Sequence, residues 1–191
     1  MTQKLLDHIR NYVAVSDSDF GKFSHLFRSM TVSKKQHVLK AGDVCDNIYF
    51  VVRGCLNMYF VTEKGVNQTA QFAIENWWIS DFLAFTKGER AEFSIEAVED
   101  SQVLCLSKSD LDKVATIFPR FETYLRTIYQ IAYGASMIRL KSLYGYSKAE
   151  MYKRFVEKYP DFARRVPQYL LASFLGLTPE YVSELRARMR S

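Results

Sequence analysis

The spacing of hydrophobic residues divides the chain into a short helical start, a strand-rich middle and a helical C-terminal part. Apolar positions recur at helical spacing over residues 3–15 and 17–28. Between about residue 31 and residue 107, short apolar runs alternate with turn-forming clusters, which is typical of antiparallel β-strands and predicts a sandwich or barrel. The predicted strands are residues 36–40, 48–53, 55–62, 68–74, 77–79, 93–98 and 102–107, with a short helix near residues 81–85.

Helical signals return after residue 107, each introduced by a serine cap or by a proline. A serine followed three residues later by an acid has the spacing of a capping box, and proline is favoured in the first turn of a helix. These signals predict helices that begin after Ser107, at Pro119 and after Ser147, that end near Phe118, Leu143 and Tyr159, and a linking turn over residues 161–165.

The long helix that begins at Pro119 carries two apolar stripes. One stripe has the four-three spacing of a coiled-coil seam and consists of Phe121, Leu125, Ile128, Ala132, Ala135, Arg139 and Ser142. The other contains Tyr124, Ile131 and Ile138. The pattern leaves two arrangements open. Either one stripe packs on the strand domain and the other on a partner helix, or the helix is buried on both faces within one chain.

Residues 166–189, VPQYLLASFLGLTPEYVSELRARM, predict a helix, a sharp turn and a second helix. Ala172 lets two crossing helices approach each other, and Gly176 can adopt the left-handed backbone angle of a tight turn. Thr178 and Pro179 open the second helix with a cap and a proline. A helix-turn-helix of this kind places its second helix in the DNA major groove, whereas the simpler alternative is a helical hairpin that closes a domain.

Positive charge is concentrated in the part of the chain that holds this motif. The whole chain has a net charge of +5. From Arg139 onward there are eleven Lys and Arg against five Asp and Glu, whereas the preceding residues carry fifteen against sixteen. A basic C-terminal segment favours contact with DNA phosphates, and the simpler alternative is a solvated basic surface.

Composition and motifs argue against several other classes of protein. No apolar run approaches the roughly 20 residues of a membrane span, and the N-terminus lacks a signal-peptide core, so we expect a cytoplasmic protein without a membrane partner. No nucleophile–base pair or P-loop is present, and the cysteines and histidines are scattered, so we expect neither a catalytic site nor a metal site. The scattered residues are His8, His25, His37, Cys45, Cys55 and Cys105.

Three segments resemble the Crp/Fnr family of bacterial transcription regulators. VLKAGDVCDNIYFVVRGCLNMYF (residues 38–60) is similar to the early strands of the family's β-roll, and EFSIEAVEDSQVLCLSKSDLDKV (residues 92–114) to its last strands and first helix. SFLGLTPEYVSELR (residues 173–186) is similar to the family's DNA-reading motif. The chain resembles in particular the short Bacteroidetes branch, whose members end soon after the recognition helix.

The resemblance implies an α+β protein with an antiparallel, jelly-roll-like β-roll sensor domain (residues 1–118), a long dimerisation helix (residues 119–145) and a C-terminal helix-turn-helix domain (residues 146–191). It implies a DNA-binding transcription regulator whose two copies bind a pseudo-palindromic site on double-stranded DNA. RNA polymerase is a further candidate partner. The implied residues of the homodimer interface are Phe121, Leu125, Ile128, Ala132 and Ala135.

The resemblance also places candidate effector residues in the β-roll. Relatives that bind cyclic nucleotides carry a Gly-Glu pair and later an Arg-Ser or Arg-Ala pair, because an arginine fork and backbone N–H groups suit a phosphate and a carboxylate suits a ribose hydroxyl. A cyclic nucleotide is therefore a candidate ligand, although the replacement of Gly-Glu favours a different effector or none. The corresponding residues in this chain are Ser80, Asp81, Arg90 and Ala91, with Ser136 of the long helix near a base-contacting position.

The polar side of the second helix of the motif is expected to face the DNA groove. A glutamate can accept from a cytosine amino group, but Glu184 stands where many relatives place a guanine-reading arginine, so the target sequence should differ. The alternative is a ligand-sensing or interaction module of the same fold that has lost sequence-specific DNA binding. The expected groove residues are Thr178, Glu180, Tyr181, Glu184 and Arg188. The expected phosphate contacts, which position a protein without specifying sequence, are Arg164, Arg165, Arg186 and Arg190.

Overall fold

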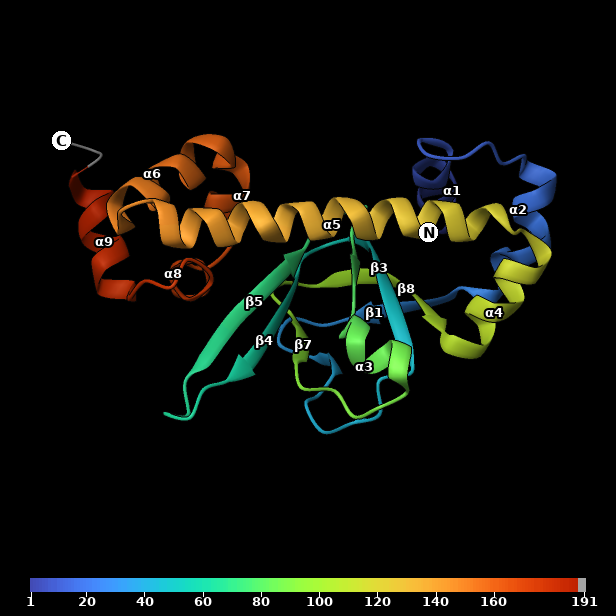
Figure 1. The fold of residues 1–191 in the computed structure, drawn as a ribbon, viewed down its shortest axis with the longest axis horizontal. Helices are drawn as coiled ribbons and strands as arrows, with labels where there is room; N and C mark the ends of the chain where they lie inside the picture. Colours follow the sequence, from blue (N-terminus) through green and yellow to red (C-terminus); the bar gives the residue numbers. More distant parts are fainter. Residues whose placement is uncertain (189–191) are drawn as a thin grey trace. The chain divides into compact units, whose positions relative to one another are not determined.

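The computed structural model describes residues 1–188 and groups the chain into two compact units. The β-roll unit consists of residues 1–60 and 71–130, and the head unit consists of residues 61–70 and the described residues from 131 onward. Helix α5 (Arg120–Gly145) is continuous (yellow to orange in Figure 1) and contributes its first part to the β-roll unit and the rest to the head unit. This division differs from the three domains expected from the sequence, in which the long helix stood alone.

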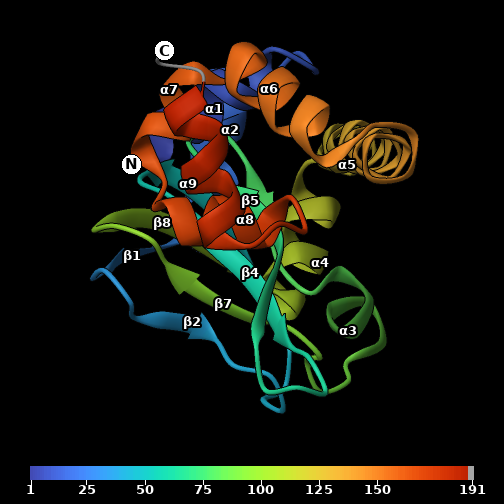
Figure 2. The same cartoon turned by 90° about the vertical axis from the view of Figure 1, so that its left-hand side faces the viewer.

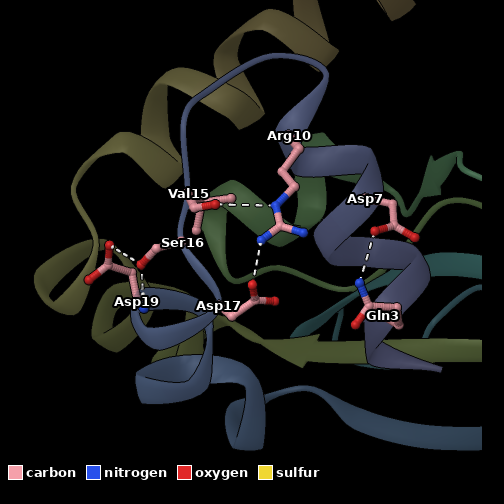
Figure 3. A network of polar contacts seen from close by, with 7 residues as sticks. All are labelled: Gln3, Asp7, Arg10, Val15, Ser16, Asp17 and Asp19. Carbon is pink, nitrogen blue, oxygen red and sulfur yellow. Dashed lines mark hydrogen bonds and ion pairs between the residues drawn. The ribbon is translucent and has the colours of Figure 1, made fainter.

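Two short helices precede the sheets, and polar contacts close the loop between them (Figure 3). They are α1 (Thr2–Arg10) and α2 (Asp17–Phe23), followed by the 3-10 turn η1 (Ser24–Leu26). The Arg10 guanidinium donates to the carbonyl of Val15 at 3.2 Å and pairs with Asp17 at 3.1 Å. Ser16 caps α2 by accepting from the Asp19 N–H at 3.0 Å. This loop has bonds of its own, so the first helix ends at Arg10 and not near residue 15 as expected.

The strands of the described chain form two four-stranded sheets, with the orders β1-β8-β3-β6 and β2-β7-β4-β5 (Figures 1 and 2). Pairs such as β3 with β8 and β4 with β7 are antiparallel, which confirms the antiparallel β-roll. The strands are β1 (Arg28–Val32), β2 (His37–Leu39), β3 (Asn47–Arg53), β4 (Leu56–Val61), β5 (Asn67–Ala73), β6 (Trp78–Ile79), β7 (Ser94–Ala97) and β8 (Ser101–Ser107).

The sequence pattern did not predict strand β1. Its first four residues are exposed or half-buried and only Val32 is buried, so the apolar alternation that marks a strand is missing. The strand exists because it pairs with β8, from Arg28 opposite Cys105 to Val32 opposite Ser101. Tertiary pairing thus decides the structure where the local signal is weak.

The first part of α5 lies in the core of the β-roll unit. Phe121 is 0% exposed and Leu125 is 5% exposed. The centroid of the Phe121 ring lies 6.1 Å from that of Phe23 and 6.0 Å from that of Phe27. Phe121 and Leu125 are therefore covered by their own chain, which corrects the expectation that they join two chains. The other helices of the unit are α3 (Phe82–Lys87) and α4 (Lys108–Ile117).

The hydroxyl of Tyr124 connects α5 to β6 and to α1. Trp78 Nε1 donates to it at 2.7 Å, and His8 Nδ1 lies 2.8 Å away. Because an indole only donates, the tyrosine oxygen accepts from Trp78 and its own hydrogen can go to an unprotonated Nδ1 of His8. Burial lowers the pKa of His8, which favours the neutral ring that this chain of bonds requires.

The head unit is helical and has a hydrophobic core of its own. Ser147 caps α6 by accepting from the Glu150 N–H at 3.2 Å, as the sequence predicted. Residues 160–165, expected to form a turn, are a short helix with Pro160 in its first turn. The helices are the second part of α5, α6 (Lys148–Lys158), α7 (Pro160–Arg165), α8 (Gln168–Phe174) and α9 (Pro179–Arg188). The core consists of Met151, Tyr152, Ala163, Leu171, Ala172, Leu175, Leu177, Val182 and Leu185.

We expect Tyr124→Phe to lower the free energy of unfolding of the β-roll unit by about 1–3 kcal/mol, because the buried Trp78 N–H loses its acceptor. Urea unfolding followed by tryptophan fluorescence measures this change, since Trp77 and Trp78 both lie in that unit. Tyr169→Phe is the matched control, because the Tyr169 side chain is 56% exposed. Equal unfolding midpoints for the two variants would show that the hydroxyl contributes nothing.

Candidate nucleic-acid interface

The connection between α8 and α9 has the geometry of a helix-turn-helix. Gly176 has a φ of +66°, a backbone conformation that a side chain disfavours. The Leu177 N–H donates to the carbonyl of Ala172 at 2.9 Å. Ala172 is 0% exposed, as expected for a small residue where two helices cross. The helix-turn-helix predicted from the sequence is confirmed.

Helix α9 buries one side and exposes the other. Thr178 caps the helix by accepting from the Tyr181 N–H at 3.2 Å, and Val182 and Leu185 lie in the core of the head unit. Tyr181 is half-buried against that core, so part of its side chain supports the helix. The exposed side, which is the side available to DNA, includes Thr178, Glu180, Glu184 and Arg188.

Arg186 anchors α9 inside the head unit. Its Nε donates to the Tyr152 hydroxyl at 3.0 Å. Its two terminal nitrogens donate to Gln168 Oε1 and to the carbonyl of Ala163, both at 3.1 Å. These partners lie on α6, α8 and α7, so one guanidinium fixes α9 to three other helices of the unit. The expectation that Arg186 contacts a phosphate does not fit these bonds, because all three nitrogens already donate within the unit.

Arg164, Arg165 and Arg188 of the head unit are exposed. Arg164 and Arg165 lie in the last turn of α7, and Arg164 pairs with Asp161 of the same helix. An exposed ion pair of this kind costs little to open, so Arg164 can reach a phosphate. Arg188 lies in the last turn of α9. Arg190, also assigned to a phosphate, lies outside the described residues.

In the β-roll unit, Asp81 is used by the fold itself. It is 5% exposed and caps α3, because its carboxylate accepts from the Ala84 N–H at 3.2 Å. The same carboxylate accepts from the Glu92 N–H at 2.9 Å. Ser80 is 1% exposed and donates to the carbonyl of Asn47 at 2.8 Å. The carboxylate expected to bind a ribose is thus already a structural acceptor.

The other candidate effector residues also make internal bonds. The Arg90 guanidinium donates to the carbonyl of Gly42 at 2.6 Å. The Ala91 N–H donates to the carbonyl of Asp43, and its carbonyl accepts from the Gly42 N–H, both at 2.8 Å. These bonds join the loop of residues 41–45 to the loop of residues 89–92. Ser136 belongs to the head unit, where it is exposed and donates to a carbonyl of its own helix at 3.0 Å.

Arg139 has a structural role that its predicted place in the coiled-coil seam does not indicate. Arg139 donates to the carbonyl of Ala70 at 2.5 Å and to that of Phe174 at 2.7 Å. A charged residue within an apolar stripe is rarely buried without polar partners. The position of Arg139 in the stripe therefore indicates that its guanidinium binds polar groups. Which carbonyls it binds depends on segments far apart in the sequence, so periodicity could not identify them.

In the described part of the chain, potential metal ligands are dispersed and the cysteine thiols are buried. Within residues 1–188, no three His, Cys, Asp or Glu side chains come together as a possible metal site. Burial raises the pKa of the Cys45 and Cys105 thiols, which disfavours a reactive thiolate at either position. No helix in the described part of the chain has the length and hydropathy needed to cross a membrane.

Comparison with known proteins identifies regulators of the same architecture. The family description "Cyclic nucleotide-binding domain" matches residues 29–117. The Fumarate and nitrate reduction regulatory protein of Vibrio cholerae is 25% identical over 176 residues, which cover 85% of this chain and 69% of the relative. FixK2 from Bradyrhizobium japonicum matches with a TM-score of 0.71 and 18% identity over 86% of this chain and 84% of that chain. The c-di-GMP responsive global regulator CLP of Xanthomonas campestris matches with a TM-score of 0.70 and 12% identity over 92% of each chain.

We expect Arg186→Ala to lower the stability of the head unit by about 2 kcal/mol, because α9 loses its bonds to the three other helices. Thermal unfolding followed by circular dichroism measures the loss. Arg188→Ala is the matched control in the same helix and should leave stability nearly unchanged. A phosphate role for Arg186 would give the opposite result, namely unchanged stability and a salt dependence of DNA binding that falls by about one unit of slope.

Proposed function

We propose that this chain, which belongs to the Crp/Fnr family of DNA-binding transcription regulators, acts as a homodimer whose two heads bind a pseudo-palindromic DNA site. The observation that carries the proposal is α9. It follows a tight glycine turn, it is anchored by Arg186, and it keeps a continuous polar side exposed. A helix held in this way can enter the major groove without disturbing its own core.

The side chains on this face favour a particular kind of recognition. Glu180 and Glu184 carry carboxylates that can accept from the amino group of cytosine. Arg188 is the exposed donor of the same helix. We assign Arg164 and Arg165 on α7 to phosphates, where they set the position of the head on the duplex. Specificity in this arrangement comes from α9, and much of the attraction to DNA comes from α7.

The second part of α5 supports the proposal of a homodimer. An exposed apolar helix face is typical of an interface between helices. Gly134 lies within this stretch, and no atom lies within 4 Å of the position that a side chain would take, so a second helix can approach closely there. We propose that α5 of a second copy covers this face, with Ile128, Ala132 and Ala135 at its margin. The exposed apolar residues are Ile131 (51%), Tyr133 (66%), Met137 (42%), Ile138 (63%), Leu140 (44%), Leu143 (38%) and Tyr144 (85%).

The hydrogen bonds of Asp81 and Arg90 restrict which kind of effector the β-roll can bind. A cyclic nucleotide bound as in the resembling relatives would have to replace the bonds from Ala84 and Glu92 to Asp81 and the bond from Arg90 to Gly42. Breaking the cap of α3 costs about 1 kcal/mol. We therefore propose that the signal of this regulator is not an anionic nucleotide held by these residues.

Selection of bound sequences from random double-stranded DNA tests the DNA-binding proposal. We expect a two-fold symmetric site with half-sites about 10 base pairs apart. Arg188→Ala should weaken binding to that site about tenfold, which is within the discrimination that one good base contact provides. Arg164→Ala should weaken binding to all sequences alike and reduce the salt slope by about one. A shallow salt slope with no enriched sequence would instead favour a module that has lost DNA reading.

A charge on the exposed face of α5 tests the homodimer. We expect Ile138→Glu to shift the protein from dimer to monomer in sedimentation velocity, because two desolvated carboxylates would face each other across the two-fold axis. Leu83→Glu is the matched control, since Leu83 is 65% exposed on α3, outside the proposed interface. Dimers that persist in Ile138→Glu would place the contact elsewhere on the chain.

A further inference from the structure

We infer that the first residues of β5 (67–70) are a structural part of the DNA head, and that Arg139 and Ser173 are the positioning residues that hold α8 against them. The inference rests on the proposed function, because it concerns the helix that supports the DNA-reading helix. Residues 61–70 belong to the head unit although they are far from α8 in the sequence. Figure 2 shows α8 beside β5, and hydrogen bonds join the two.

Ser173 occupies the free edge of a β-sheet. Strand β5 is the last strand of its sheet, so one side of its backbone has no neighbouring strand to pair with. The Ser173 hydroxyl accepts from the Thr69 N–H at 2.8 Å and donates to the carbonyl of Asn67 at 3.2 Å. The side chain of Gln68 donates to the carbonyl of Ser173. A single hydroxyl thus replaces the two bonds that another strand would make, at a place where Thr69 is 1% exposed.

Arg139 fastens the same junction from α5. Its guanidinium donates to the carbonyl of Ala70 at 2.5 Å and to that of Phe174 at 2.7 Å, and it lies 4.1 Å from the centroid of the Phe174 ring. Phe174 is the last residue of α8, whose carbonyl has no partner within the helix, and a cation at this end complements the helix dipole. The planar guanidinium of arginine can donate several hydrogen bonds and stack on an aromatic ring at the same time, whereas the ammonium group of lysine cannot.

The contacts of Arg139 and Ser173 with β5 and α8, here called the junction, depend on one another. Burial lowers the pKa of Arg139, and its buried Nε has no hydrogen-bond partner among the described residues. The guanidinium has therefore lost part of its hydration, and hydrogen bonds to backbone carbonyls offset this cost. These bonds exist only while β5 and α8 remain in place. If either element moves, Arg139 loses its compensation, so the junction should open as a whole.

The position of α8 in turn sets that of α9. Gly176 and the bond from Leu177 to Ala172 define the turn between them, and Arg186 connects α9 to Gln168 of α8. On the other side, β5 continues as residues 71–73 into the β-roll unit. A displacement of β5 would therefore move α8 through the bonds of Ser173 and Arg139, and with it α9, the proposed DNA-reading helix.

Hydrogen exchange of the full chain tests the junction without requiring DNA. We expect Ser173→Ala and Arg139→Lys to raise the rate of amide exchange about tenfold in residues 61–70 and at the end of α8. Ser173→Ala removes two hydrogen bonds, and Arg139→Lys removes the guanidinium that stacks on Phe174. Ser173→Thr keeps the hydroxyl and should restore protection. Arg154→Lys is the matched control, because that arginine is exposed on α6 and pairs with Glu150. Unchanged exchange in both test variants would overturn the inference.

DNA binding tests the positioning role. With a site selected as above, Ser173→Ala and Arg139→Lys should weaken specific binding about tenfold and leave non-specific binding and its salt slope unchanged, because no phosphate contact is removed. Faster exchange with unaltered specific affinity would overturn the positioning role. An equal loss of specific and non-specific binding would do so too, since it would indicate general loss of the head. If the unmodified chain selects no site, the proposed function fails, and the exchange experiment still decides whether the junction exists.

Discussion

One helix has to complete two separate cores, and this constraint shapes the whole chain. Helix α5 has 26 residues and is therefore about 39 Å long. Its first part supplies Phe121, Tyr124 and Leu125 to the β-roll unit, where they are buried. Its second part supplies Arg139 to the head unit and leaves apolar side chains exposed. A helix with these different surroundings cannot keep one hydrophobic stripe along its length, and its sequence accordingly shows two.

Arg186, Arg139 and Asp81 orient the elements around them by binding neutral polar groups, most of them backbone groups, and not opposite charges. Arg186 binds a carbonyl of α7, Arg139 binds carbonyls of β5 and α8, and Asp81 accepts from two backbone N–H groups. A partly desolvated charge needs compensation wherever it lies, and backbone dipoles supply it with a fixed direction. Each of these residues therefore determines where a short helix lies: α9, α8 and α3 respectively. The hydrophobic cores hold the helices together, and these bonds fix their orientation.

The sequence predicted the strands other than β1, the caps and the helix-turn-helix because each depends on neighbouring residues. Ser147, Thr178 and Gly176 act within one turn of the chain, and their roles follow from local geometry. The errors concern residues whose partners are distant. Phe121 fits a seam by spacing, yet its ring packs on Phe23. Arg186 and Asp81 look like ligand-binding residues because the resemblance identifies the position, whereas their bonds to helices α6–α8 and to Glu92 appear only once the chain is folded.

The charges of α9 suggest how a head of this kind would achieve specificity. Arg186, in the last turn of α9, is occupied within the unit, which leaves Glu180, Glu184 and Arg188 on the exposed side. DNA phosphates repel the two carboxylates, and only a hydrogen bond from a base offsets this repulsion. An incorrect sequence therefore loses more binding free energy than a correct sequence gains. In the proposed function, attraction then comes from outside the reading helix, from the arginines of α7 and from accurate placement of α9. Recognition of this type depends strongly on the pose of the helix, which gives the bonds of Arg186, Arg139 and Ser173 their importance.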